Sequence, residues 1–263
     1  MILIINDNKV QEKIETIKKE NKGKQIIHIS DKKSNVSTNL NMLRVPIGFS
    51  AFDHISKICV ILKQIFGFSG RQYAMFQQKA INLYDEFKAF EDDTSSNANL
   101  VTKAITLLDV LNKINKKLDD VKERGNEYEI YCGKELYQQL DTILASDDMK
   151  QLCVKDGNDV GFDKLDGKIV NIHDDNVRYF LVMYFLLSIG SGFPHKDFVF
   201  ILENVDKLVE RLYETNEENL SIDSFYLSML CEKLGESNFV FTGSSQALSK
   251  LKERAKLAHA LVD

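Results

Sequence analysis

Five short runs of apolar and β-branched residues, each bounded by turn residues, do most to constrain the fold of this chain. The runs are nearly continuous in apolar residues, a pattern typical of parallel strands that are covered on both faces. Segments with helical periodicity separate them at residues 9–21, 177–189 and 222–234. This alternation predicts an α/β fold with a mostly parallel sheet of about five strands flanked by helices and joined by right-handed crossovers. The runs are residues 1–5, 25–30, 168–173, 198–203 and 238–242.

The long stretch between the second and third predicted strands has a different pattern. Its apolar residues recur at helical spacing, which predicts amphipathic helices. We therefore expect residues 50–150 to form a helical insertion subdomain, and residues 1–49 and 151–263 to form the α/β core. One apolar stripe is Ile55, Ile58, Cys59, Leu62, Ile65 and Phe66, and another is Leu107, Leu108, Leu111, Ile114 and Leu118.

Composition and charge exclude several classes of protein. A net charge of −5 and a pI near 5.6 give the whole chain no basic footprint for nucleic acid. The longest apolar run, residues 179–189, is too short to span a bilayer, and the N-terminus lacks the features of a signal peptide. We therefore expect a cytoplasmic protein with no membrane insertion. The cysteines include no C-x-x-C pair, which argues against a zinc site and against disulfides. They are Cys59, Cys132, Cys153 and Cys231.

The end of the fourth apolar run resembles part of a metal site. Glu203 ends this run and Asn204 follows it. In ATPases that hold phosphate in a glycine-rich loop, an acid at the end of such a strand orients magnesium, and a second carboxylate activates water. An amide cannot accept a proton at neutral pH, so Asn204 would leave the base position empty. The sequence also contains no G-x-x-x-x-G-K-[ST] motif. We therefore favour a protein that is not an enzyme, and we assign no catalytic residue.

Several stretches, in their order along the chain, carry a resemblance to a known family. Residues 1–8 look like a first strand with a shortened phosphate loop, and residues 25–31 look like a second strand that ends in an acid. Residues 41–84 are similar to a strand, a proline and two long helices, residues 162–170 to a strand entry, and residues 241–246 to a strand with a polar sensor. This order resembles the HerA/FtsK branch of P-loop motor ATPases, which includes conjugation-type ATPases and HerA-like proteins of antiviral and DNA-processing systems. The resemblance implies a degenerate P-loop fold that lacks the Walker A loop.

The resemblance also implies roles for polar residues near the strand ends, and each role has a structural alternative. Glu203 and Asp206 would orient a metal ion. Alternatively, they are ordinary carboxylates at the start of a helix, where the helix dipole favours negative charge. Gln246 would sense a phosphate group, or its segment is an ordinary capped turn between a strand and a helix.

Two further segments could contact anions. The shortened loop could offer backbone amides to an anion, or it could be a tight turn. The basic segment near the C-terminus could contact nucleic acid or a neighbouring subunit, or it could be a solvated helix face. These residues are Asn6, Asp7, Asn8 and Lys9 in the loop, and Lys250, Lys252, Arg254 and Lys256 in the basic segment.

Histidine positions match no metal-binding spacing. His28 and His173 fall within predicted apolar strands, and His195 precedes another. We expect all three to be structural histidines with satisfied hydrogen bonds.

These observations lead to one function and two alternatives. We favour a nucleotide-independent pseudo-ATPase that binds a protein partner as a structural or regulatory subunit in a DNA-processing, defence or conjugation-type system. It would need no cofactor, with ATP and magnesium as the alternative. The second hypothesis is a DNA-binding ring or clamp, which would be a homo-oligomer. The third is a divergent AAA-like NTPase.

Overall fold

A computed structural model describes residues 2–5, 10–32, 40–45, 50–86, 105–121, 127–153, 167–189, 197–214, 238–254 and 260–262. The chain divides into two compact units. The α/β unit comprises Met1–Ser37 and Leu165–Asp263, and the helical unit comprises Thr38–Lys164.

The α/β unit contains a six-stranded sheet in the order β3-β2-β4-β5-β1-β6. All neighbouring strands pair in parallel, which confirms the predicted fold class. Five strands coincide with the five apolar runs, while β6 was not predicted because three residues without bounding turn residues give little signal. The strands are β1 (Ile2–Ile5), β2 (Gln25–Ser30), β3 (Ile169–Asn171), β4 (Phe198–Leu202), β5 (Asn238–Thr242) and β6 (Ala260–Val262).

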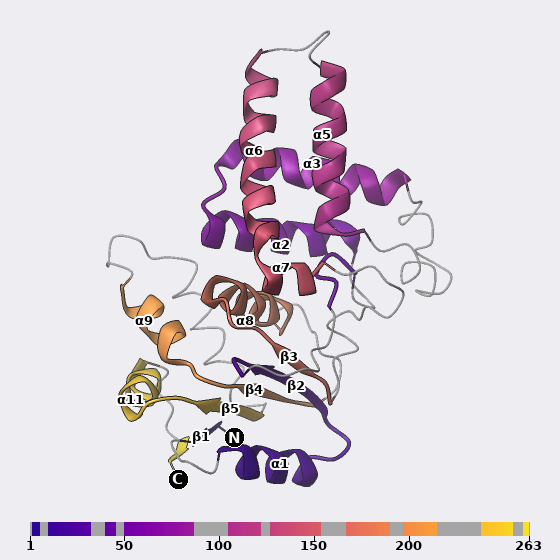
Figure 1. Cartoon of the computed structure of the whole chain (residues 1–263). Coiled ribbons are helices and arrows are strands. Elements are labelled where there is room, and N and C mark those ends of the chain that lie inside the picture. The colour runs from indigo at the N-terminus through magenta and orange to yellow at the C-terminus, as the bar shows by residue number, and fades with distance from the viewer. Residues whose placement is uncertain are drawn as a thin grey trace. The chain divides into compact units, whose positions relative to one another are not determined.

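Alternating residues of the central strands pack against helices on the two faces of the sheet. On one face, Ile14 and Ile17 of α1 (Val10–Glu20) form a cluster with Ile26, Val199, Ile201 and Val240. On the other face, Phe185 of α8 (Asp175–Ile189) stacks on Phe200 with 4.3 Å between ring centroids. Figure 1 shows α1 and α8 on opposite sides of the sheet. Helices α9 (Asp206–Glu214) and α11 (Ser245–Arg254) follow β4 and β5. The helix expected at residues 222–234 lies outside the described residues.

The helical unit is built from amphipathic helices, as its periodicity predicts. Ser50 begins α2 by accepting a hydrogen bond from the Asp53 backbone amide at 3.0 Å, and Gly67 ends this helix with a positive φ of 70°. The helices are α2 (Ala51–Phe66), α3 (Gly70–Glu86), α5 (Leu107–Val121), α6 (Glu127–Ala145) and α7 (Asp147–Gln151).

Two flanking segments belong to the helical unit rather than to the α/β unit. The backbone amide of Leu40 donates to Gln151 O at 3.0 Å, and that of Met42 donates to Leu152 O at 2.9 Å. His54 Nε2 of α2 lies 2.8 Å from Met42 O. Residues 40–45 and 151–153, which the sequence division placed with the α/β core, are therefore joined to the helices by these backbone contacts.

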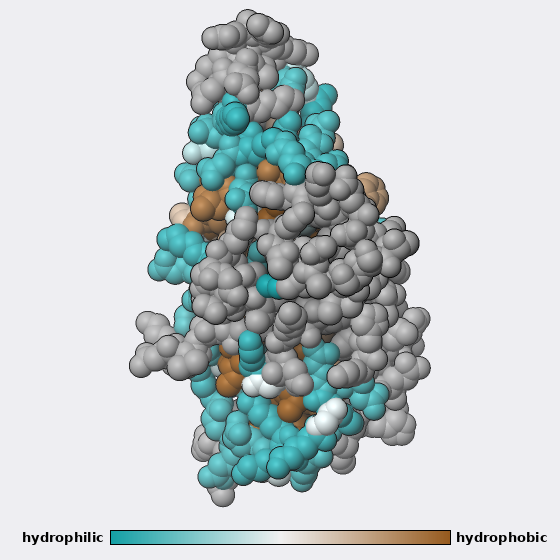
Figure 2. Space-filling model, turned by 90° about the vertical axis from the view of Figure 1, so that its right-hand side faces the viewer, coloured by the Kyte–Doolittle hydropathy of each residue, from teal (hydrophilic) through white to brown (hydrophobic). Residues whose placement is uncertain are grey.

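Exposed large hydrophobic side chains are unevenly distributed between the described parts of the two units. On the face drawn in Figure 2, the described residues are mainly hydrophilic, with small hydrophobic areas between them. Among the described residues, the exposed large hydrophobic side chains are Phe52, Leu108, Tyr128 and Tyr131, and all four lie in the helical unit. No helix in the described part of the chain is long and apolar enough to cross a bilayer.

Candidate functional site

The carboxyl ends of β2 and β4 bring polar residues together at one edge of the sheet. Parallel strands end at the same edge, where ligands of α/β proteins commonly bind. Just beyond these strands, the Glu203 backbone amide donates to Ile29 O at 3.0 Å. The Asn204 side-chain amide donates to Asp31 Oδ2 at 2.7 Å. Residues that are far apart in the sequence therefore form one polar cluster.

Glu203 is at the centre of this cluster. Its side chain is only 3% exposed, and its Oε1 lies 2.7 Å from Nε2 of the buried His28. Its other oxygen, Oε2, accepts a hydrogen bond from Gln11 Nε2 at 3.1 Å and lies 3.2 Å from Lys32 Nζ. Both carboxylate oxygens are thus engaged by nitrogen donors from β2, from the residues just after β2, and from α1.

The donors around Glu203 keep it ionised. Burial by itself raises the pKa of Glu203, but the hydrogen bonds and charges of His28 and Lys32 outweigh burial and lower the pKa to about 2. An ionised carboxylate only accepts hydrogen bonds, so His28 Nε2 carries the proton in this contact. His28 Nδ1 has no hydrogen-bond partner among the described residues. The negative charge of Glu203 is compensated within the protein.

Asn204 has a structural role in the turn after β4. Its φ is 54°, in the left-handed region that asparagine tolerates better than most residues. Its backbone amide donates to Thr242 Oγ1 at 3.0 Å, and its carbonyl accepts from Arg178 Nη2 at 2.7 Å. Arg178 Nη2 also donates to Glu203 O. These bonds hold the turn after β4 in one conformation.

The described residues do not fit a magnesium ion. Magnesium takes oxygen ligands and usually keeps several waters. At Glu203 both oxygens already accept nitrogen donors, and the Lys32 ammonium would repel a second cation. In the part of the chain that the structure describes, there is no group of three or more His, Cys, Asp or Glu side chains suited to a metal.

Asp206 does not contribute to the carboxylate cluster. Its Oδ2 accepts the Ser244 backbone amide at 3.0 Å, which joins the start of α9 to the turn after β5. A Cβ at Gly243 would lie 2.7 Å from this oxygen, so a larger residue there would displace the Asp206 carboxylate from this bond. The bond gives Asp206 the role of a structural carboxylate at a helix start.

The remaining predicted residues are not brought to Glu203 by any described contact. Gln246 is exposed in the first turn of α11, where Ser244 Oγ accepts the Ala247 backbone amide at 3.2 Å. Lys250 of α11 is half-buried, and only the backbone is described for Lys252 and Arg254. The loop residues Asn6, Asp7, Asn8 and Lys9, together with Lys256 and His195, lie outside the described residues. His173 is exposed, with Nδ1 2.6 Å from Asp31 O.

Sequence reasoning identified Glu203 but not the residues that surround it. Alternation along β2 places His28 on the same face as Ile26, and alternation along β4 places Glu203 with Ile201. Because both side chains fall on the same face of the sheet, this alternation could have predicted a contact between His28 and Glu203. Gln11, Lys32 and Arg178 had no comparable signal, because polar residues near turns and helix starts are common.

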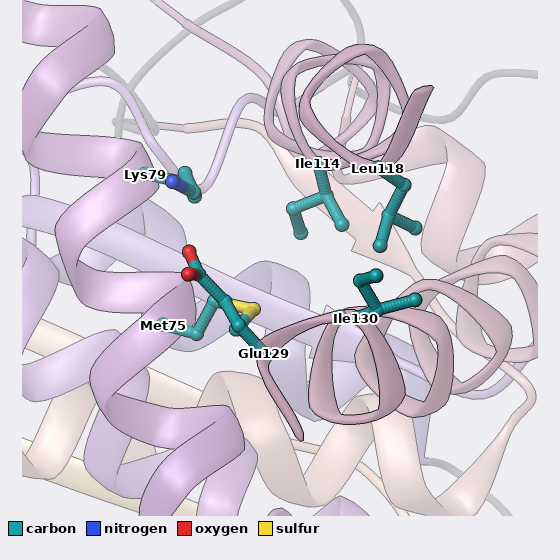
Figure 3. A pocket seen from close by; sticks show the side chains of 7 residues that line it. Met75, Lys79, Ile114, Leu118, Glu129 and Ile130 are labelled. Atoms are coloured by element: carbon teal, nitrogen blue, oxygen red, sulfur yellow. The ribbon is translucent and has the colours of Figure 1, made fainter. Parts of the chain in front are cut away.

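The helical unit contains a separate small pocket between α3, α5 and α6, with a volume of about 20 Å³. Lys79 lines this pocket although the residue is only 5% exposed. Figure 3 shows the amino group of Lys79 near the carboxylate of Glu129, with Ile114, Leu118 and Ile130 on the other side. No sequence motif pointed to this pocket.

Comparisons with known proteins support the fold. No protein-family model matches the sequence, and no curated protein matches it. Among solved structures, the chain is similar to the structure of VirB4 of Thermoanaerobacter pseudethanolicus, with a TM-score of 0.58 and 13% sequence identity. The similarity covers 99% of this chain and 76% of that chain. The chain therefore shares its α/β fold with VirB4.

Proposed function

We propose that this chain is a nucleotide-independent subunit with a P-loop NTPase fold, which binds a protein partner in a structural or regulatory role. One observation carries the proposal. The carboxylate at the position where an ATPase orients magnesium, Glu203, has both oxygens engaged by protein donors, and one of these donors is the cation Lys32.

Three features together argue against hydrolysis. The sequence has no phosphate-binding motif, Asn204 stands at the base position, and Glu203 is already compensated. Loss of a single preorganised donor costs an enzyme ~10²- to 10³-fold in rate. Losses that act on the same transition state need not add, but together these losses argue against useful turnover.

The helical unit is the better candidate for partner binding. Phe52, Leu108, Tyr128 and Tyr131 are exposed there, at 45% to 60% of their surface. Aromatic residues are enriched at protein interfaces, where their large apolar area contributes to binding. The fold likeness to VirB4 and the sequence resemblance to conjugation-type ATPases lead us to assign the chain to a conjugation-type system.

A calorimetric titration tests nucleotide independence. Wild-type protein, Glu203→Gln and the exposed-site control Glu12→Gln would each be titrated with ATP and with ADP in excess magnesium, up to about 1 mM, the upper end of usual substrate affinities. We expect no saturable binding to any of the three. Micromolar binding by the wild type and the control that Glu203→Gln loses would overturn the proposal and revive an ATP-dependent role.

A further inference from the structure

We infer that Lys32 is a built-in counter-ion of Glu203, which takes the place of a divalent cation and excludes one from this edge of the sheet. The inference rests on the proposed function, because a site that works without magnesium nucleotide needs another source of positive charge. It assigns that charge to one side chain of this chain.

The geometry supports this role for Lys32. Its Nζ lies 3.2 Å from Glu203 Oε2, and its side chain is 53% exposed whereas that of Glu203 is 3% exposed. The ammonium therefore reaches a buried carboxylate from a solvent-accessible position, as an ion from solution would. The Lys32 backbone amide donates to Ser30 Oγ at 3.2 Å, which tethers the residue to the end of β2.

The other contacts of Glu203 differ in kind or in place from that of Lys32. Gln11 is uncharged, so it satisfies a lone pair without adding positive charge. His28 is 2% exposed and contacts the other oxygen. A buried carboxylate is costly unless it is paired, and an ammonium already at Oε2 repels any divalent cation that approaches the same oxygen. Lys32 thus contributes to the charge compensation of Glu203 and also excludes cations from Oε2.

Substitution of Lys32 should convert this position into a site for an oxygen-seeking divalent cation. Lys32→Met removes the charge with little change in side-chain length. Of the two described donors to Glu203 Oε2, only the Gln11 amide would then remain. Lys32→Asp goes further, because it supplies a second carboxylate where the ammonium lay. Paired carboxylates and water are ligands that Mg²⁺ and Mn²⁺ accept.

Titration with Mn²⁺, followed by the electron paramagnetic resonance signal of the free ion, tests the inference. Wild type, Lys32→Met, Lys32→Asp and the double variant Lys32→Asp with Glu203→Gln would be compared. The control is Lys22→Asp, which makes the same change of charge at an exposed lysine of the same unit. Circular dichroism would verify that each variant is folded.

We expect the wild type and Lys22→Asp to bind no Mn²⁺ up to about 1 mM, the range of weak oxygen-ligand sites. Lys32→Asp should bind about tenfold more tightly than wild type or better, a difference of about 1.4 kcal/mol, and the double variant should lose that gain. Lys32→Met should show a smaller gain in Mn²⁺ affinity. If Lys32→Asp does not fold, the result for Lys32→Met tests the inference.

Either of two results would overturn the inference: Mn²⁺ binding by wild type that depends on Glu203, or folded Lys32 variants that bind no more Mn²⁺ than wild type. Nucleotide binding is measured separately. Micromolar ATP binding by the wild type would contradict the proposed function, whereas the Mn²⁺ results with Lys32 variants judge the counter-ion role.

Discussion

The two units differ in a charged side chain that one buries and in apolar side chains that the other exposes. In the α/β unit, the sheet edge at the carboxyl ends of β2 and β4 buries a carboxylate and satisfies it internally with His28, Lys32 and Gln11. In the helical unit, Leu108 and Tyr131 are more than half exposed. The polar edge of the α/β unit thus has its buried charge satisfied within the protein, while the helical unit exposes large apolar side chains.

The two units also bury histidine differently. His28 of the α/β unit lies against a carboxylate, whereas His54 of the helical unit is fully buried against the carbonyl of Met42. Burial lowers the pKa of His54 to about 3, although its bond to Met42 acts in the opposite direction. One histidine therefore supports a buried charge, and the other is kept neutral by burial.

The largest expected effect comes from breaking the buried pair of the α/β unit. His28→Leu removes the donor to Glu203 Oε1 and leaves a buried charge with less compensation, so we expect a loss of about 3–5 kcal/mol in the free energy of unfolding. Urea unfolding followed by circular dichroism measures it. His173→Leu, at an exposed histidine of the same edge, should cost much less.

A double variant sharpens this prediction. If the loss comes from the uncompensated carboxylate, then His28→Leu combined with Glu203→Leu should recover part of the stability, because two apolar side chains need no pairing. If the losses in the free energy of unfolding simply add in the double variant, the uncompensated charge is not their cause. Lost packing of the two side chains would then explain them.

Acid should weaken the two units in different pH ranges. Because the pKa of His54 falls from 6.5 to about 3 on folding, the unfolded chain binds the proton more readily, and this contribution to stability declines as pH falls from 6.5 towards 3. For Glu203, burial raises the pKa but His28 and Lys32 lower it from 4.5 to about 2, so its contribution is present above pH 4.5 and is lost as pH falls through 2.

Hydrogen exchange of amides in each unit, measured between pH 7 and the lowest pH at which the fold survives, checks this order. The helical unit should lose protection first. His54→Gln keeps a donor for the carbonyl of Met42 but does not titrate, so it should remove the decline that begins near pH 6.5. A decline that persists in His54→Gln would assign the acid sensitivity to another group.

The smallest effect on stability is expected at the exposed apolar residues. Leu108→Ser and Tyr131→Ser should change the free energy of unfolding by no more than about 0.5 kcal/mol, because exposed side chains contribute little to folding. If these residues form the partner surface, the same variants should capture less of the protein that the wild type enriches from its native cells. Equal capture would place the interface elsewhere, and Lys22→Asp serves as the unrelated surface control.

Local patterns in the sequence predicted most of the fold. The run at residues 198–203 is nearly continuous in apolar residues, and β4 (Phe198–Leu202) forms there because both faces of the strand are covered by helices. The apolar stripe through Ile55, Ile58 and Leu62 predicted the buried face of α2. These elements could be predicted because the period of a hydrophobic pattern depends only on the local geometry of the helix or strand.

The candidate site was predicted only in part. Glu203 was recognised because it ends an apolar strand, and its place at the polar edge follows from the sheet being parallel. Asp206 was grouped with it by proximity in sequence, but its carboxylate bonds to Ser244 instead. A separation of three residues across a strand-to-helix turn changes the direction of the side chain, which sequence spacing alone does not reveal.

The sequence by itself determined where the strands and the long helices form and that one strand ends in an acid without a following base. Only the tertiary structure decided what neutralises that acid. His28 meets Glu203 across 175 residues of sequence because β2 pairs with β4 in the register His28↔Ile201, and a shift of one residue would turn the His28 side chain to the other face. Lys32 reaches the same carboxylate because the end of β2 lies beside it. Register and strand order depend on the packing of the whole unit, so no local pattern of residues contains them.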